Sequence, residues 1–283
     1  SSNAKLNVGQ GVSFSMSTTT ANGVAISGGM GLTQTITTNA AAGVTGGAKL
    51  TFATGGATIV VGDVEAGDTP GSVGGVVGGQ IGDNGGFNSK VETAFADDDG
   101  LGLSLATAIG GSSLSIVYVA NDGADTLGTI NSSTSGDDAI TSASITVPMG
   151  MYTITAGVAD SDSGESASGA SVAAALAGGT LTVGYSLQTL VDGTSDATSS
   201  DLSASGDTTV TGATYVMALD ADTTVSVGLQ NAKDADNDST SQFDASVSRS
   251  LGGGASVFLD IRSLSGDTTV DGSAVAVGTS VSF

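Results

Sequence analysis

The sequence contains no cysteine, no histidine and no tryptophan, and it has two prolines. Without Cys and His, a zinc site built from those ligands is impossible. Histidine-based general-base chemistry, including a Ser-His-Asp triad, is impossible as well. The lack of cysteine fits an exported protein that does not rely on disulfides, although many cytosolic proteins also lack it. We therefore predict that the protein is not an enzyme.

Positive charge is also scarce. Six Lys and Arg residues stand against 28 Asp and Glu residues, which gives a formal net charge of −22. Binding to nucleic acid needs phosphate neutralisation by Lys and Arg, so this class of function is excluded. Charged residues make up 12% of the chain and aromatic residues 4%, whereas an ordinary soluble domain has roughly 25% charged residues. Gly, Ser, Thr and Ala take their place, and these residues suit tight turns and closely packed strands.

Long hydrophobic runs are missing too. No stretch approaches the roughly 20 apolar residues of a membrane-spanning helix. The chain begins at Ser1 in polar sequence, as a mature or truncated chain would. Closed β-barrels also satisfy every backbone group in lipid, and the sequence signal of each of their strands is weak. The sequence therefore leaves a membrane location open.

Strict alternation of apolar and polar residues dominates the sequence. From Leu6 to Met16 the even positions are mostly apolar, whereas the odd positions are small or polar. The pair Asn22-Gly23 follows, and the even positions are apolar again up to Ile36. Alternation on both sides of an Asn-Gly pair predicts a β-hairpin, because Asn and Gly accept the positive φ that the turn requires.

The same pattern recurs to the end of the chain and predicts about fifteen strands, most of them as long as the roughly 9–11 residues of a tilted membrane strand. Short Gly- or Asp-rich turns alternate with longer acidic connections. The short turns are expected at Gly55-Gly56, Gly110-Gly111, Gly178-Gly179 and Gly252-Gly253-Gly254, and the long connections at 121–138, 160–169, 191–207 and 231–241. Short turns at one end and long loops at the other are typical of an outer-membrane barrel. The whole of 1–283 is therefore predicted to be a single antiparallel β-barrel domain.

One predicted connection, residues 64–99, is much longer than the others. It is rich in glycine and carries Glu65, Asp68 and Asp83. Loops of this length with little secondary structure are usually functional or disordered. A further short strand around Val91–Phe95 remains possible within it.

Three segments resemble the general diffusion porins of Gram-negative outer membranes, in particular the alphaproteobacterial type. They are the C-terminal strand 277–283, the hairpin 251–257 and the stretch 52–63 that precedes the long loop. The resemblance spans nearly the whole chain. It implies a barrel of usually sixteen strands, so a first strand could be missing from this sequence. It also implies a third long loop that folds into the lumen, and a C-terminal Phe283 that serves as an assembly signal.

The resemblance further implies an outer-membrane homotrimer whose partners are the lipid bilayer and its outer-leaflet lipopolysaccharide, with no cofactor required. Two features depart from the family pattern. The chain has no Trp and four Tyr residues, so the aromatic girdles at the membrane interfaces are thin. Six basic residues also cannot supply the dense Arg cluster that many family members place opposite the third loop.

The alternation also assigns faces to the charged residues. If the apolar positions face lipid, then Lys5, Lys49, Asp260 and Arg262 face the lumen. Arg249 shares the parity of Phe243 and is expected to reach the headgroup zone near its turn. The resemblance adds acidic pore-lining residues from the long loop, and these are Glu65, Asp68 and Asp83. Ordinary solvated positions are the alternative interpretation of all these charges.

Asp234, Asp236 and Asp238 place carboxylates at alternate positions of one loop. Carboxylate oxygens suit a hard cation such as calcium. The segment lacks the Gly and the distal Glu of an EF-hand loop, however, so a solvated acidic loop remains the alternative to a calcium site.

Two functions remain compatible with the sequence. The first is an outer-membrane porin, a passive diffusion channel for small hydrophilic solutes and ions that prefers cations. The second is a structural cell-surface protein, such as an S-layer subunit or an adhesin, with bound calcium. A β-solenoid of the second kind should show one fixed repeat period. The intervals here vary with loop length, which favours the barrel, whereas the thin aromatic girdles favour the surface protein.

Overall fold

The structure is a computed structural model that describes residues 8–36, 49–65, 99–120, 139–162, 164–190, 206–233, 235–266 and 271–281. Within these ranges the regular secondary structure consists of β-strands. No helix in the described part of the chain is long and apolar enough to cross a membrane.

Fifteen strands occupy the described ranges, which agrees with the strand count expected from the alternation. They are β1 (Val8–Thr19), β2 (Ala25–Ile36), β3 (Lys49–Thr54), β4 (Ala57–Glu65), β5 (Asp99–Ile109), β6 (Ser112–Val119), β7 (Ile140–Met149), β8 (Tyr152–Ser161), β9 (Ser166–Leu176), β10 (Gly179–Leu190), β11 (Gly206–Ala218), β12 (Thr223–Lys233), β13 (Ser239–Gly252), β14 (Ala255–Gly266) and β15 (Gly272–Val281).

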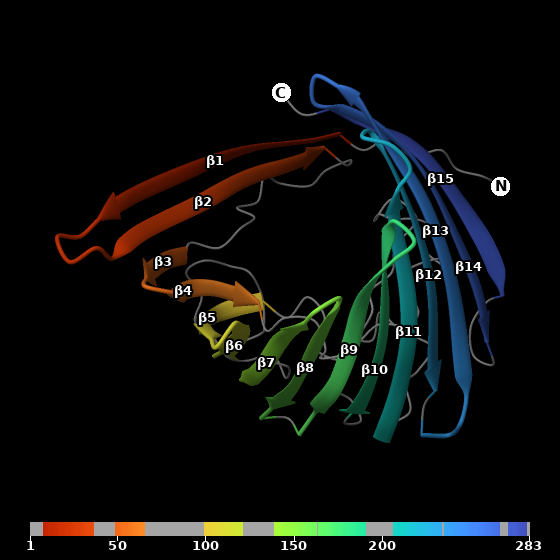
Figure 1. Cartoon of the computed structure of the whole chain (residues 1–283), viewed down its shortest axis with the longest axis horizontal. Coiled ribbons are helices and arrows are strands. Elements are labelled where there is room, and N and C mark those ends of the chain that lie inside the picture. Colours follow the sequence, from red (N-terminus) through yellow and green to blue (C-terminus); the bar gives the residue numbers. More distant parts are fainter. Residues whose placement is uncertain are drawn as a thin grey trace. The chain divides into compact units, whose positions relative to one another are not determined.

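The chain divides into two compact units. The first comprises Ser1–Ala66 and Asp97–Thr141 and contains β1 to β6; the second comprises Gly67–Ala96 and Ser142–Phe283 and contains most of β7 and all of β8 to β15. Within each unit every strand pairs with its neighbours in the sequence, and the recorded registers are antiparallel. Figure 1 shows β8 to β15 of the second unit side by side in chain order, in a sheet that curves. This is the up-and-down order expected from successive hairpins.

Short turns join the strands at one end of each hairpin, because glycine adopts the positive φ that these turns need. Between β3 and β4, Gly55 and Gly56 have φ of 48° and 103°, and Thr54 pairs directly with Ala57. Gly110 and Gly111 repeat this arrangement between β5 and β6, with φ of 59° and 89°. The two-residue turns expected at these glycine pairs are confirmed.

The turn between β9 and β10 lies one residue earlier than expected. Leu176 pairs with Gly179, so the turn residues are Ala177 and Gly178, with φ of 47° and 84°, instead of Gly178 and Gly179. Gly179 instead belongs to β10 and lies close against β11. A Cβ added there would lie 2.5 Å from the backbone oxygen of Val216 and 2.7 Å from Cζ of Tyr215, so only glycine fits this position. The Tyr215 hydroxyl lies 3.0 Å from the Leu176 carbonyl oxygen and 3.2 Å from that of Ala177.

Two connections expected to be long are short. Asp160 pairs with Ser166, so the expected loop 160–169 reduces to the residues between β8 and β9. Lys233 pairs with Ser239, so the expected loop 231–241 reduces to residues 234–238. In both cases the strands continue into polar sequence, because pairing satisfies the backbone whatever the side chains are. The polar flanks were therefore a poor guide to where these strands end.

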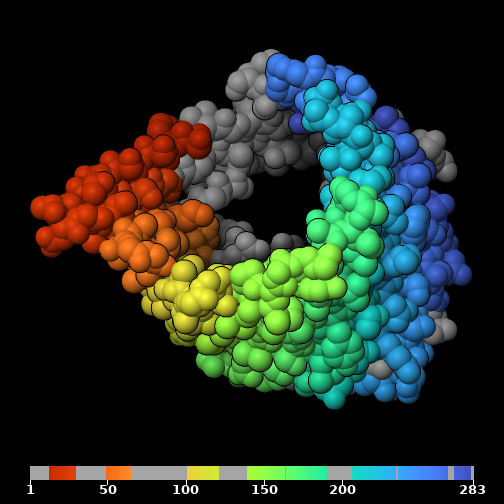
Figure 2. Space-filling model, in the orientation of Figure 1, coloured from red at the N-terminus to blue at the C-terminus, as the bar shows by residue number. Residues whose placement is uncertain are grey.

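The sheet of the second unit has two faces of opposite character. Strand residues of one parity are exposed and largely apolar, and we call this side the exposed face. It includes Val158, Val172, Val183, Tyr185, Leu187, Leu229, Phe243, Val247, Leu259, Val275, Val277 and Val281. Many residues of the other parity are buried, and we call that side the buried face. It includes Ala159, Ala167, Ser186, Gln188, Thr208, Val210, Gln230, Ala232, Thr240, Gln242, Asp244, Asp260, Arg262 and Leu264. Figure 2 shows the side chains of β8 to β15, coloured green to blue, packed against one another as a continuous wall.

In the first unit, β5 and β6 follow the same rule, whereas residues 13–19 of β1 are exposed at both parities. Leu103 and Tyr118 face each other across β5 and β6, and both are exposed. Val64, Val117 and Val119 have the opposite parity and are buried. The period-two pattern predicts that Phe14, Leu103, Val183 and Val281 face lipid. All four are exposed, and their contact with lipid stays a prediction. Ile26 and Tyr215 are half-buried instead.

Replacing Tyr215 by Phe should lower the free energy of unfolding by about 1 kcal/mol, because the hydroxyl that meets the Leu176 and Ala177 carbonyl oxygens is lost. The midpoint of unfolding in guanidinium chloride measures this. Tyr185→Phe is the matched control, since it removes a hydroxyl from an exposed ring of the same face. Equal midpoints for the two variants would show that Tyr215 does not hold the turn.

Candidate functional site

The buried face of β12, β13 and β14 is unusual because it is polar. The register places Gln230 opposite Gln242, and Asp244 opposite Arg262. Asp260 lies on the same face, two residues before Arg262. All five side chains are buried, although such side chains are normally exposed. Buried polar groups are stable only when they are hydrogen-bonded, so the partners of these groups define the site.

Arg262 and Asp244 form a two-pronged ion pair within this row. Nε of Arg262 donates to Oδ1 of Asp244 at 2.8 Å, and a terminal guanidinium nitrogen donates to Oδ2 at 3.1 Å. Asp244 is 1% exposed and Arg262 is 5% exposed. The planar fork of arginine matches both oxygens of a carboxylate, which fixes the orientation of the two side chains. The pair thus cancels one positive and one negative charge inside the fold.

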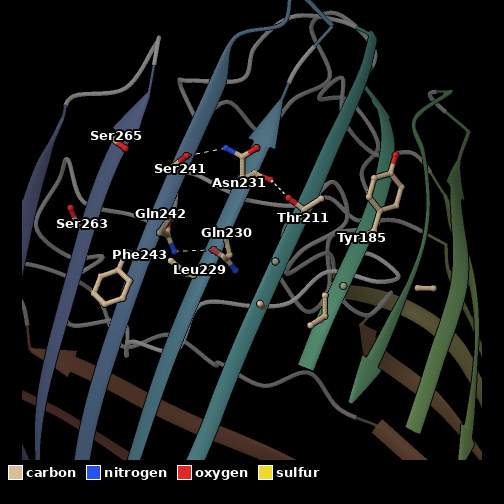
Figure 3. Close-up of a pocket in the computed structure, with 15 residues that line it drawn as sticks. Tyr185, Thr211, Leu229, Gln230, Asn231, Ser241, Gln242, Phe243, Ser263 and Ser265 are labelled. Atoms are coloured by element: carbon tan, nitrogen blue, oxygen red, sulfur yellow. Dashed lines mark hydrogen bonds between the residues drawn. The ribbon is translucent and has the colours of Figure 1, made fainter. Parts of the chain in front are cut away.

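Two glutamines extend the ion pair to β12. Nε2 of Gln242 donates to Oδ2 of Asp244 at 2.9 Å and to Oε1 of Gln230 at 3.0 Å. Figure 3 shows the link between Gln230 and Gln242 as a dashed line from β12 to β13. Gln242 thus donates to a neighbour on each side, and these two hydrogen bonds fix the orientation of its side-chain amide. The four side chains form one ladder across three strands, which we call the polar ladder: Gln230, Gln242, Asp244 and Arg262.

Three further hydroxyl groups lie on the same buried face, on β10, β11 and β13. The side-chain oxygens of Ser186, Thr208 and Thr240 are fully enclosed and have no hydrogen-bond partner among the described protein atoms. A buried hydroxyl without a partner costs roughly 1–3 kcal/mol, and ordered water normally removes this cost. The buried face is therefore suited to contact with water and not to a dry apolar core.

The structure places two of the predicted lumen residues, Asp260 and Arg262, on the buried face, opposite in parity to the exposed Leu259. In the first unit, Lys49 pairs with Gly62, whereas the adjacent Leu50 pairs with Val61, and both of these are exposed. Lys49 thus has the parity opposite to the apolar side, as the alternation predicted. Whether any of these residues lines a pore stays a prediction.

Three of the predicted pore residues lie outside the described residues, and these are Asp68, Asp83 and Lys5. The possible strand around Val91–Phe95 lies outside them as well. Glu65 ends β4, and its backbone pairs with Asp99 of β5. The long connection between these two paired strands therefore runs from residue 66 to residue 98, within the expected limits of 64–99.

The predicted calcium ligands lie in the connection between β12 and β13. Asp236 is exposed and Asp238 is half-buried, whereas Asp234 is outside the described ranges. No group of three potential metal ligands occurs among the residues that the structure describes. Calcium binding at this connection stays a prediction.

Arg249 sits beside the turn between β11 and β12. It donates to the Thr223 hydroxyl at 3.1 Å and lies 3.7 Å from the carboxylate of Asp220. The pKa of Asp220 is below its usual value, first because the backbone N–H of Asp222 donates to its carboxylate, and then because of Thr223 and Arg249. Arg249 therefore lies at a strand end on the exposed face, the position predicted from its parity.

The exposed face carries a hollow of 770 Å³ between β9 and β14. Small residues such as Ala170, Gly184 and Ala213 line it, and the larger side chains of Tyr185, Leu229 and Phe243 stand around them (Figure 3). A polar row follows at one side, where Nδ2 of Asn231 donates to the Ser241 hydroxyl at 2.9 Å. The apolar part of the exposed face is thus bordered by a row of uncharged polar side chains. Such a border is expected where a protein surface passes from an apolar medium into water.

Sequence reasoning missed Gln230, Gln242 and Asp244. Their even positions give the same parity as Asp260 and Arg262, so the alternation could have placed them on this face. What it could not give is the register between β12, β13 and β14, which brings the carboxylate of Asp244 against Arg262. Contacts across strands depend on register, and a slip of one residue moves every side chain to the other face.

The sheet carries apolar side chains on one face and the polar ladder on the other, and comparisons with solved structures identify its fold. A porin refined at 1.8 Å resolution superposes with a TM-score of 0.65 and 16% identity, covering 95% of this chain and 90% of that one. A mutant porin of Rh. blastica gives a TM-score of 0.61 and 16% identity, with 96% and 89% covered.

An anion-selective porin from Comamonas acidovorans has a TM-score of 0.61 and 10% identity, covering 95% of this chain and 85% of that one. No protein-family model and no curated protein matches the chain. The chain therefore has the porin fold, which confirms the fold class predicted from the sequence. At these sequence identities the similarity establishes the fold only, and the activity has to be argued from the residues of the site.

Replacing Gln242 by Leu should lower the free energy of unfolding by roughly 1–3 kcal/mol, because the buried oxygens of Gln230 and Asp244 each lose a donor. Unfolding in guanidinium chloride measures the change. Ser248→Ala is the control on the same strand and the same face, at an exposed position. Equal losses in both variants would show that the polar ladder contributes nothing specific.

Proposed function

We propose that the protein is a porin: a passive diffusion channel for small hydrophilic solutes and ions in the outer membrane of a Gram-negative bacterium. One observation carries the proposal, and it is the separation of the two faces within the second unit's sheet. The apolar exposed face matches the lipid-facing band of a transmembrane barrel. The polar buried face matches the lumen side, where water and solutes pass.

The exposed face supports the membrane location. Side chains such as Val183, Leu229 and Val277 lie exposed along strands of membrane-spanning length. Exposed apolar surface of this extent is costly in water and marks a membrane or protein interaction site. In lipid the same surface costs nothing, while strand pairing satisfies the backbone.

The electrostatics support a preference for cations. The chain carries 28 acidic and six basic residues, and Asp and Glu remain ionised at neutral pH. Acidic groups at a pore raise the local concentration of cations within about 8 Å at physiological salt. One protein of similar fold is an anion-selective porin, so the fold permits either preference and the charges of this chain decide it.

Further elements of the proposal come from the resemblance to general porins. They are a homotrimeric assembly, contact with outer-leaflet lipopolysaccharide, and a constriction formed by residues 64–99 with Glu65, Asp68 and Asp83. Calcium bound by Asp234, Asp236 and Asp238 of the connection between β12 and β13 also belongs to the proposal. The mechanism is diffusion through the lumen and involves no covalent chemistry, which is consistent with a sequence that lacks Cys and His.

The alternative of a structural surface protein receives less support. A β-solenoid stacks equal repeats along one axis, whereas the strands here form successive antiparallel hairpins. The solved structures with a similar fold are porins. We therefore do not carry this alternative further.

Two leucines with the same exposed fraction test the membrane location. Leu229 in the middle of β12 and Leu219 at the turn between β11 and β12 are both 58% exposed. In a bilayer, Leu229→Arg should cost roughly 2–4 kcal/mol, whereas Leu219→Arg near the interface should cost about 0–1 kcal/mol. Reversible folding into lipid vesicles measures both values. A soluble protein would tolerate the two substitutions equally, and that outcome would exclude the membrane location.

In planar lipid bilayers the purified protein should form open channels that prefer cations at low salt. The preference should weaken at high salt, because the Debye length shortens to about 3 Å at 1 M. Reversal potentials across a KCl gradient measure it. Absence of conductance would refute the channel, whereas an anion preference at low salt would refute only the electrostatic part of the proposal.

A further inference from the structure

The polar ladder affects the charge on the lumen side of the proposed channel, and this inference rests on the proposed function. Arg262 is the single basic side chain on the buried face within the described part of the second unit, since Lys233 and Arg249 have the opposite parity and are exposed. In isolation, Arg262 would attract anions toward this face. Its effect on permeating ions therefore depends on what lies next to it.

Asp244 is placed to cancel that charge. Its two carboxylate oxygens receive Nε and a terminal nitrogen of Arg262 at 2.8 Å and 3.1 Å. The two side chains come from paired positions of β13 and β14, so the backbone register itself holds them together. A charge at this distance from its counter-charge contributes little field at the distance of a passing ion, because the two potentials nearly cancel.

The glutamines keep the carboxylate in this position. Gln242 donates to Oδ2 of Asp244, the oxygen that also receives the terminal nitrogen of Arg262. Gln242 is held in turn by Gln230. Because Asp244 is nearly fully buried, its carboxylate cannot leave Arg262 for water without breaking the whole ladder. The cancellation is thus a permanent feature of the fold.

We propose that Asp244 is a specificity-determining residue, which permits cation preference by neutralising Arg262 on the buried face. Asp260 lies on the same face, opposite Ser246, so the formal charges of β13 and β14 on this face are two negative and one positive. Removing the charge of Asp244 would leave one negative and one positive charge, so this face would lose its negative excess. The alternation placed Arg262 on the lumen face, and the ion pair with Asp244 neutralises its charge there.

The experiment measures the potassium-to-chloride permeability ratio in planar bilayers at low salt for Asp244→Asn, Arg262→Gln and the double variant. A unit charge roughly 10 Å from an ion in water changes its local concentration about twofold. Asp244→Asn should therefore lower the ratio by roughly two- to fourfold, and Arg262→Gln should raise it by a similar factor. The double variant, which is neutral and of nearly unchanged size, should return to the wild-type ratio.

Asp222→Asn provides the matched control, because it removes the same charge from an exposed turn residue at one end of the strands, away from Asp244. It should change the ratio by less than half as much as Asp244→Asn. If the wild-type protein conducts and Asp244→Asn shifts the ratio no more than this control, the inference is wrong and the channel function stands. If Asp244→Asn does not assemble, Arg262→Gln still tests the inference. An unchanged or lowered potassium-to-chloride permeability ratio in Arg262→Gln would overturn it.

A wild-type protein that forms no channels at all would overturn the proposed function together with the inference. The thermal stability of each single variant is compared with that of the double variant. This comparison shows whether a shifted permeability ratio comes from a loss of structure or from the change in charge. A variant that folds like the wild-type protein and conducts with a shifted ratio supports the role of Asp244.

Discussion

Antiparallel hydrogen bonding between strands that are neighbours in the sequence is the constraint on which the rest of this structure depends. It satisfies the backbone of both strands and makes successive side chains point to opposite faces. Once the register is set, each face acquires its character from one parity of the sequence. The apolar exposed face and the polar ladder are therefore two results of the same backbone pairing.

The polar ladder shows how this constraint makes buried charge tolerable. Breaking a buried ion pair usually costs several kcal/mol, and an intact pair is stable only if its remaining hydrogen bonds are satisfied. Here the register brings Asp244 against Arg262, and Gln242 fills the remaining position on the carboxylate. The pairing of the strands thus decides the charge that this face presents as well as its stability.

The two faces together explain an otherwise odd composition. Ser, Thr, Ala and Gly fill positions where strands lie close together and where hydroxyl groups meet water, so few large apolar residues are needed. Tyr215 shows the other use of small residues, because its ring fits over Gly179 and its hydroxyl reaches the adjacent turn. A soluble domain needs a large apolar core, whereas a channel wall of the kind proposed needs one apolar face.

The sequence by itself determined the all-β class, the number of strands, most two-residue turns and the parity that separates Leu259 from Asp260 and Arg262. These features are local: they follow from period-two alternation and from the turn preferences of glycine. Only the tertiary structure decided how far β8, β9, β12 and β13 extend. It also decided that Ala177 and Gly178 form the turn between β9 and β10, and that Asp244 neutralises Arg262. Those outcomes depend on the register between strands and on contacts such as Tyr215 with Gly179, which join residues far apart in the chain and leave no local pattern in the sequence.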